Sequence, residues 1–276
     1  MSKIVLITGC SSGIGRHLAE QLAQSSYTVV ATARSVEALR DLPAFLKLPL
    51  DVTNPDSINE AIGNTLQQFG RIDVLINNAG YTMLGALEEV SDEQTRQVFD
   101  VNVFGALRMI RAVVPVMRKQ RSGCIINISS IAGKLSTPVN GTYSATKFAL
   151  EALSDALRLE LLPFGIQVVV VEPGAIQTRF DDTAQVYAKD ILFNPASPYR
   201  TLYRQNEKFS ADMRLQEPGP EAVCNVIEQV LNAQHPKPCY FAAVSLSSRL
   251  VLYFRDFLWG SVVRQMFKID AVEMQS

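Results

Sequence analysis

The sequence is poor in the residues on which several large protein classes depend. It has two histidines, one tryptophan and four cysteines in 276 residues, and the cysteines are scattered, with no C-x-x-C pair. Cysteines spaced in this way are expected to be reduced core or turn residues in a reducing compartment, not a disulfide framework. We predict no metal site.

Net charge and long apolar runs are also lacking. The 26 Lys+Arg residues nearly balance the 27 Asp+Glu residues, so no basic surface predicts a nucleic-acid partner. No uncharged stretch reaches the ~18 apolar residues that a membrane span needs, and the apolar run Ile4–Ile7 is too short for a signal-peptide core. We expect a cytoplasmic protein, with binding to a membrane surface as the less favoured alternative.

What the sequence has is a regular alternation of short β-branched apolar runs and longer helical patterns. Most runs are apolar on both faces, as buried strands of a parallel sheet must be. The alternation predicts an α/β fold with a doubly wound parallel sheet and a single domain over residues 1–276. The predicted strands are Ile4–Thr8, Thr28–Thr32, Lys47–Asp51, Val74–Asn77, Cys124–Ile128, Gln167–Glu172 and Tyr240–Val244. The predicted helices are Gly13–Gln24, Pro55–Phe69, Asp92–Arg121, Ser144–Leu162 and Pro220–Gln234.

One segment, residues 176–217, interrupts this rhythm and shows no clear period. A connection of that length inside a domain is usually functional, so we interpret it as a substrate lid. Its aromatic side chains favour an apolar pocket for a lipophilic molecule, although the same residues would also serve to anchor the segment to the core. They are Phe180, Tyr187, Phe193, Tyr199, Tyr203 and Phe209.

The first predicted strand is followed by a glycine-rich turn, Thr8 to Gly15, and then by an amphipathic helix. Glycines here permit a tight turn and a close approach of the backbone to a pyrophosphate, and the helix N-terminus offers N–H groups to phosphates. The alternatives are a plain strand–helix turn and the G-x-S-x-G elbow of a hydrolase, for which His235 is the one available triad histidine, since His17 lies on the helix itself. We favour a dinucleotide site. Its predicted residues are Gly9, Ser11, Ser12, Gly13, Ile14 and Gly15.

The end of the second predicted strand indicates which dinucleotide binds. Enzymes that use NAD usually place an acidic residue there, but this strand ends in Ala33-Arg34. A guanidinium can pair with the 2′-phosphate of NADP(H), so we predict NADP(H), with NAD(H) less favoured. The alternative is that Arg34 is a solvated loop charge.

Tyr143 and Lys147 form the candidate catalytic pair. Their i, i+4 spacing places them on one helical face. A phenol with an ordinary pKa near 10 is too weakly acidic for proton exchange at neutral pH, and a neighbouring ammonium would lower that pKa. Ser130 follows a strand at the edge of the sheet where ligands bind, near the expected position of a substrate oxygen.

Together these motifs resemble the short-chain dehydrogenases/reductases, a Rossmann-fold family. The resemblance covers about residues 3–180 and includes the glycine loop, Asn77-Asn78-Ala79-Gly80, Asn102, Ser130, Tyr143-x-x-x-Lys147 and Pro173-Gly174. The stretches Gly9–Gly13, Lys147–Glu151 and Leu161–Gly165 are similar to the branch that contains 17β-hydroxysteroid and retinol dehydrogenases.

The resemblance implies a role for each residue. Tyr143 would be the general acid/base, Ser130 would hydrogen-bond the substrate oxygen, and Lys147 would hold the nicotinamide ribose and lower the pKa of Tyr143. Asn102 would support a water in a proton relay. Other cofactor contacts would come from Asp51, Val52, Asn78, Ala79, Gly80, Pro173, Gly174, Ile176 and Thr178.

The sequence therefore predicts an NADPH-preferring oxidoreductase acting on a lipophilic ketone or secondary alcohol, steroid-, retinoid- or lipid-like. The alternatives are a 3-oxoacyl thioester reductase of the same family and a non-catalytic NADP(H)-binding sensor. The apolar and basic segment 245–268 would pack over the pocket or on a second subunit, or else lie on a membrane. By analogy with the family we expect a homodimer formed through Asp92–Arg121 and Ser144–Leu162.

Overall fold

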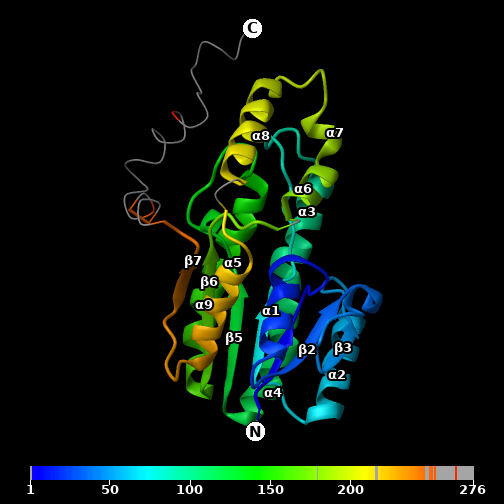
Figure 1. Cartoon of the computed structure of the whole chain (residues 1–276), viewed down its shortest axis with the longest axis vertical. Helices are drawn as coiled ribbons and strands as arrows, with labels where there is room; N and C mark the ends of the chain where they lie inside the picture. Colours follow the sequence, from blue (N-terminus) through cyan, green and yellow to red (C-terminus); the bar gives the residue numbers. More distant parts are fainter. Residues whose placement is uncertain are drawn as a thin grey trace.

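A computed structural model describes residues 2–178, 180–214 and 217–245, together with residues 249, 250, 252 and 265. In this part of the chain, seven parallel strands form one sheet in the order β3-β2-β1-β4-β5-β6-β7 (Figure 1). The predicted doubly wound sheet is confirmed, and each predicted strand lies within two residues of an observed one. The strands are β1 Ile4–Ile7, β2 Thr28–Ala33, β3 Leu46–Pro49, β4 Val74–Asn77, β5 Gly123–Ile128, β6 Ile166–Pro173 and β7 Cys239–Ala242.

Helices cover both faces of the sheet, because successive side chains of each strand point in opposite directions. Val5 and Ile7 of β1 pack with helices α1 (Gly13–Ala23) and α9 (Glu221–Asn232) on one face. Ile4 and Leu6 pack on the other face, which is covered by helices α2 (Pro55–Phe69), α4 (Ala106–Gln120) and α5 (Gly141–Leu161). Burial of each such side chain contributes about 1.5–3 kcal/mol to the free energy of folding. The sheet is therefore stabilised by two hydrophobic cores, one on each face.

Helix α2 shows why some boundaries were predictable. The side chain of Asn54 accepts hydrogen bonds from the backbone N–H groups of Asp56 and Ser57, and Pro55 occupies the first turn. Gly70 ends the helix in the left-handed region, at φ +70°. The predicted bounds Pro55–Phe69 are confirmed.

The predicted continuous helix Asp92–Arg121 is wrong. Helix α3 covers Asp92–Phe99, a π-helical stretch covers Asp100–Gly105, and α4 follows. A Cβ atom on Gly105 would lie 2.7 Å from Cγ2 of Val52, so this stretch packs too closely on its neighbour for a larger residue. Apolar periodicity does not reveal one extra residue in a turn, so the π-helix could not be predicted from the pattern.

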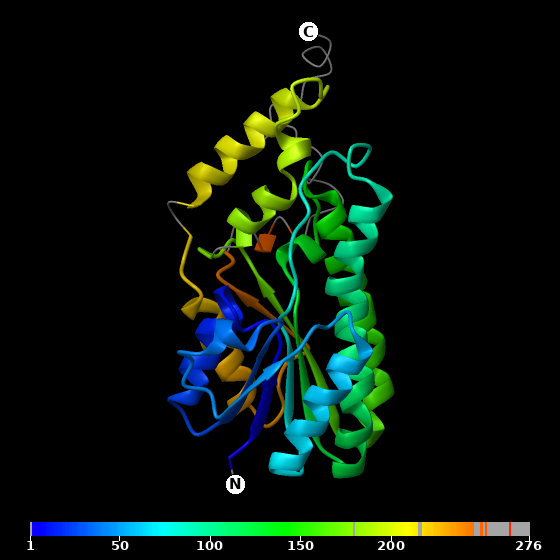
Figure 2. The ribbon, with the colours of Figure 1, turned by 90° about the vertical axis from the view of Figure 1, so that its right-hand side faces the viewer.

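No helix was predicted in the lid segment, but the structure has helices there. Residues 176–217 contain helices α6 (Phe180–Tyr187), α7 (Lys189–Leu192) and α8 (Arg200–Arg214), and these stand beyond the end of the sheet opposite the N-terminus (Figures 1 and 2). Helix α8 is mostly polar, and its buried Tyr203 packs with Ala86 and Val139. A helix with so few apolar positions leaves little periodic signal.

The predicted C-terminal segment 245–268 lies almost wholly outside the described residues. One of the few that are described, Leu252, lines the large cavity under the lid. Among the described residues, no helix is both long and apolar enough to cross a membrane.

All four cysteines are free thiols, as predicted. Burial raises the pKa of Cys10, Cys124 and Cys224 to about 12, which keeps these thiols protonated and unreactive.

Candidate active site

A cavity of about 1260 Å³ lies between the carboxyl ends of the central strands and the lid. Typical ligand pockets occupy roughly 300–1,000 Å³, so this one has room for a dinucleotide and a second molecule. The cavity lies where the strand order reverses, between β1 and β4. The predicted residues that line it are Gly9, Ser11, Ser12, Gly13, Ile14, Arg34, Asp51, Val52, Asn78, Ala79, Gly80, Ser130, Tyr143, Lys147, Pro173, Gly174, Ile176 and Thr178.

The glycine loop needs its glycines for two different reasons. Gly9 and Gly13 have φ angles of +75° and +57°, a conformation that other residues rarely adopt. Gly15 does not line the cavity but packs beneath the loop, where an added Cβ would lie 2.3 Å from Nδ2 of Asn78 and 2.5 Å from the carbonyl oxygen of Gly9. The first turn of α1 is thereby brought to the cavity edge, with its N–H groups available to an anion.

Thr8 and Asn78 join the glycine loop to the segment after β4. The backbone N–H groups of Asn78 and Ala79 each donate to Oγ1 of Thr8 at 3.0 Å. In return, Nδ2 of Asn78 donates to the carbonyl oxygens of Thr8 and Gly9. The sequence analysis assigned no role to Thr8, and its position as the residue just before the first glycine was the available signal.

Tyr143 and Lys147 lie on one face of α5 at the floor of the cavity. Both are nearly buried, and Nζ of Lys147 lies 5.5 Å from the centre of the Tyr143 ring. Nζ donates a 2.8 Å hydrogen bond to the carbonyl oxygen of Ile128, at the end of β5. Burial lowers the pKa of Lys147 to about 8, against the opposing effect of the Glu151 carboxylate. The lysine therefore remains mostly charged at neutral pH, close to the phenol.

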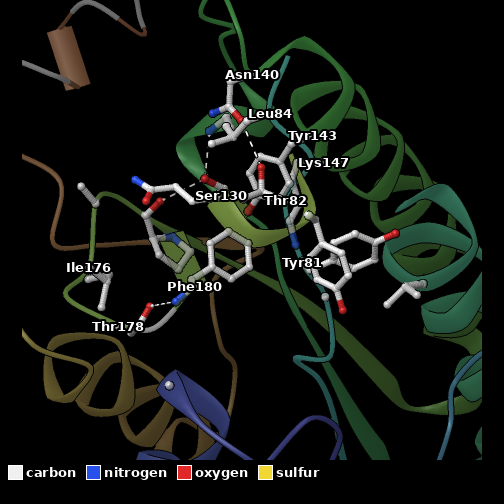
Figure 3. A pocket seen from close by; sticks show the side chains of 18 of the residues that line it. Tyr81, Thr82, Leu84, Ser130, Asn140, Tyr143, Lys147, Ile176, Thr178 and Phe180 are labelled. Atoms are coloured by element: carbon white, nitrogen blue, oxygen red, sulfur yellow. Dashed lines mark hydrogen bonds between the residues drawn. The ribbon is translucent and has the colours of Figure 1, made fainter. Parts of the chain in front are cut away.

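Ser130 faces the same space from the segment after β5. Its Oγ accepts a hydrogen bond from the backbone N–H of Ala132 and donates a long one, 3.5 Å, to the carbonyl oxygen of Pro173. A contact of that length is weak, so the hydroxyl is able to turn toward a ligand oxygen. Figure 3 shows Ser130 and Tyr143 lining the same pocket.

Asn102 does not line the cavity, unlike the other three predicted catalytic residues. It is buried in the π-helical stretch, where its Oδ1 accepts from the backbone N–H of Tyr81 and its Nδ2 donates to the carbonyl oxygen of Tyr81 and to Oγ1 of Thr146. These hydrogen bonds hold the segment after Gly80 against α5. The predicted water relay stays a prediction.

The far end of the cavity is formed by the lid aromatic Phe180 and by residues that no sequence motif marks. Oγ1 of Thr82 donates to Oδ1 of Asn140, and the ring of Phe180 meets the Tyr143 ring edge-on at 5.7 Å (Figure 3). Tyr81 and Leu84 complete this wall, and Tyr81 also contacts Tyr187 of the lid. None of these positions carries a motif, so only the three-dimensional structure brings them together.

Five of the six lid aromatics line the cavity, and Tyr199 does not. Tyr203 both lines the cavity and anchors the lid. Its hydroxyl accepts from the backbone N–H of Ala86 and donates to the carboxylate of Glu89. Burial, followed by that hydrogen bond, raises its pKa to about 12. The lid aromatics therefore serve both roles considered from the sequence: they line the cavity, and they anchor the segment to the rest of the domain.

Comparisons with known proteins agree with this geometry. A sequence model described as short chain dehydrogenase matches residues 3–186. A 3-ketodihydrosphingosine reductase of Bacteroides thetaiotaomicron is 44% identical over 184 residues, which cover 67% of this chain and 68% of that protein. The human 17-beta-hydroxysteroid dehydrogenase type 1 is 36% identical over 253 residues, which cover 86% of this chain and 76% of that protein.

Solved structures show the same fold. A short-chain dehydrogenase from Streptomyces avermitilis superimposes with a TM-score of 0.75 at 36% identity, covering 96% of this chain and 98% of that one. ElxO with NADP bound has a TM-score of 0.70 at 28% identity, covering 88% and 97%. An enzyme of Burkholderia phymatum in complex with NAD has a TM-score of 0.75 at 26% identity, covering 99% and 98%.

Proposed function

The chain belongs to the short-chain dehydrogenase family, and we propose that it is an NADP(H)-preferring oxidoreductase for a lipophilic ketone or secondary alcohol. The observation that carries the proposal is that the glycine loop, Arg34, Ser130, Tyr143 and Lys147 all line one cavity. One cavity would therefore hold the cofactor at its phosphate-binding groups and the substrate at its proton-transferring groups, side by side.

The residues around the glycine loop fit a dinucleotide. The contacts of Gly9 and Gly15 leave no room for side chains, so the backbone is free to approach a pyrophosphate closely. Arg34 is exposed at the cavity edge, and the carboxylate that follows it in the chain, Glu37, is paired with Arg40. Arg34 has no ion-pair partner among the described residues, and a guanidinium that shares the cavity with Ser11 and Ser12 favours a 2′-phosphate and hence NADP(H).

A nicotinamide bound beside Ser130, Tyr143 and Lys147 would provide the hydride chemistry, and these residues would handle the proton and the oxygen of the substrate. During reduction the Tyr143 hydroxyl donates its proton to the carbonyl oxygen, and in the reverse direction the phenolate removes the proton of the alcohol. Ser130 donates a hydrogen bond to that oxygen and stabilises the charge that develops on it. The Lys147 ammonium, held by Ile128, stabilises the phenolate form of Tyr143.

The chemistry of the cavity wall supports an apolar substrate. Phe180 lies against Tyr143, Leu84 and Ile176 line the same cavity, and the lid adds further aromatic side chains. Thr82 and Asn140 are among the polar residues that line the cavity, and the lid adds others, such as Arg200, Arg204 and Glu207. Such a wall suits a carbonyl on a hydrophobic skeleton that carries few polar groups.

The test is NADPH consumption by the purified protein with a panel of steroids, retinoids, simple ketones and 3-oxoacyl thioesters. We expect turnover with one of the lipophilic ketones, and Tyr143→Phe to lower kcat by about 10³-fold while NADPH fluorescence still reports binding. Tyr27→Phe is the matched control, because that hydroxyl bonds Asn232 far from the cavity. Equal turnover by Tyr143→Phe and the control would refute the proposed mechanism, and preference for thioesters would replace the substrate class.

A further inference from the structure

Lys134, Glu151 and Glu172 form an ionic cluster next to the segments that carry Ser130, Tyr143 and Lys147. Nζ of Lys134 contacts Oε2 of Glu151 at 2.9 Å and Oε1 of Glu172 at 3.5 Å. The side chains of the two glutamates are 7% and 1% exposed, whereas that of Lys134 is 36% exposed. One oxygen of Glu151 is buried and has no hydrogen-bond partner among the described residues. Two carboxylates therefore share one ammonium in a region that water hardly reaches.

Each member of the cluster lies next to a part of the catalytic site. Lys134 follows Ser130 by four residues, and Glu151 follows Lys147 by one turn of α5. Glu172 directly precedes Pro173, whose carbonyl oxygen accepts from Ser130. The cluster thus joins α5, which carries Tyr143 and Lys147, and the segment after β5, which carries Ser130, to the end of β6. Strands β5 and β6 are neighbours in the sheet (Figure 1).

The packing between these segments is tight. A Cβ atom on Gly133 would lie 2.9 Å from Oγ of Ser129 and 3.0 Å from Cγ of Glu151. The short turn after Ser130 is therefore seated directly on the stem of Glu151. A shift of that carboxylate would move the turn, and with it the position of the serine hydroxyl relative to the phenol.

The charges of the cluster do not cancel when both carboxylates are ionised. Burial, followed by the neighbouring Glu151, raises the pKa of Glu172 to about 7, against the opposing effect of Lys134. Cys239 of β7 lies against both carboxylates but is neutral, because burial raises its pKa to about 11. The remaining charges that act on the cluster are Lys147, through Glu151, and Arg158, through Cys239.

We propose that Lys134, Glu151 and Glu172 form an ionic clamp that positions Ser130 against Tyr143 and Lys147 for proton transfer. All three are positioning residues, since they act through the catalytic side chains and do not line the cavity. The kinetic consequence rests on the proposed function, whereas the existence of the clamp does not. Lys134 already supplies a cation to the carboxylates, so the clamp needs no metal ion.

The clamp is tested first without substrate, by thermal unfolding of the wild type and of Glu172→Gln from about pH 5 to 8. The pKa of Glu172 is raised in the folded state, so the folded protein holds a proton that the unfolded chain releases near the ordinary pKa. Stability should fall as pH rises toward about 7 and level off above it. The amide does not titrate, so this slope should be smaller in Glu172→Gln. If stability depended on pH equally in the wild type and in Glu172→Gln, the proposed sharing of Lys134 by two buried carboxylates would be overturned.

Positioning is tested with Lys134→Met, which leaves two buried carboxylates without their cation. We expect kcat to fall by about tenfold or more, with KM for the ketone and the Kd for NADPH changed by less than about threefold. Lys134→Arg should restore most of the activity because it restores the charge. Lys119→Met, an exposed lysine at the end of α4, is the matched control. Wild-type kcat in Lys134→Met would refute the positioning role.

Amide hydrogen exchange separates this proposal from the proposed function. Lys134→Met should speed exchange in residues 129–135 even if no ketone is reduced, and unchanged exchange there would overturn the clamp. Absence of turnover in the wild type would count against the proposed function alone. Stoichiometric uptake of Zn²⁺ by the wild type, lost in Glu172→Gln, would overturn the clamp in favour of a metal site.

Discussion

The glycine loop and the lid face each other across one cavity, but different contacts hold them in place. In the loop, the side chains of Thr8 and Asn78 bond to backbone groups, and the glycines themselves touch backbone: a Cβ on Gly9 would lie 2.9 Å from Cα of Ala79, and one on Gly15 would lie 2.5 Å from the carbonyl oxygen of Gly9. In the lid, side chains make the attachment, as Tyr203 does with Glu89 and Ala86. Backbone contacts admit one residue type, whereas side-chain contacts admit many. The loop should therefore tolerate almost no change, and the lid should tolerate changes that retune the substrate.

The largest effect is expected at Gly15. In Gly15→Ala the new methyl group would collide with Asn78 and Gly9, so we expect NADPH affinity to fall by about 100-fold or more and the free energy of unfolding to fall by about 1–3 kcal/mol. Fluorescence titration and urea unfolding measure the two quantities. Gly63→Ala is the matched control, because Gly63 is exposed in α2 with nothing near its Cβ. In Gly63→Ala we expect the free energy of unfolding to rise by about 0.5–1 kcal/mol. Similar losses of stability in the two variants would contradict the claim that the glycine loop is the less tolerant region.

A smaller and more selective effect is expected at Arg34. Arg34→Asp should lower kcat/KM for NADPH by about 100-fold and that for NADH much less, because a carboxylate repels the 2′-phosphate that the guanidinium binds. Steady-state kinetics with both cofactors test this. Arg40→Asp serves as control, since that arginine is exposed and pairs with Glu37. An equal response to the two cofactors would show that Arg34 is a solvated charge.

In the lid, Tyr203→Phe should loosen the anchor without touching the loop. Loss of the hydroxyl leaves the Ala86 N–H and the Glu89 carboxylate without that partner, which should lower the free energy of unfolding by about 1–2 kcal/mol. We expect KM for large ketones to rise by about threefold to tenfold while the Kd for NADPH stays the same. A changed Kd would mean that lid and loop are not independent.

The smallest effect on turnover is expected at exposed apolar side chains of the π-helical stretch and of α5. Phe104, Phe148 and Leu159 are 49%, 37% and 72% exposed on the π-helical stretch and α5. We propose that the π-helical stretch and α5 form a homodimer interface, because exposed large apolar side chains often mark one. Leu159→Glu should convert the dimer to a monomer in light scattering. A wild-type monomer would remove the proposal.

The same contrast explains how much of the molecule was predictable. The sheet and helix α2 follow from alternating apolar residues and from caps at Asn54 and Gly70, which are local signals. The catalytic motif residues Ser130, Tyr143 and Lys147 converge because each follows or faces the carboxyl end of a strand, and their place at the cavity could be predicted. Their individual roles remain predictions that the variants above test.

What the sequence did not reveal depends on contacts between distant segments. The helices of the lid carry many polar residues, and Thr82 and Asn140 meet at the cavity from two separate segments. The buried cluster of Lys134, Glu151 and Glu172 is of the same kind, since its members are dispersed in the chain and each alone is an ordinary charge. No local pattern marks such groups.

The π-helical stretch Asp100–Gly105 also changes the direction in which two helices present their side chains. One additional residue in a turn rotates everything upstream by about 100° relative to everything downstream. The rotation lets Asn102 face Tyr81 while Gly105, three residues later, lies flat against Val52. The positions of Tyr81 and of Val52, an expected cofactor contact, are therefore both set by a single inserted residue. Deleting one residue from this turn would restore an ordinary helix and misalign both positions together, even though none of the catalytic side chains would have been altered.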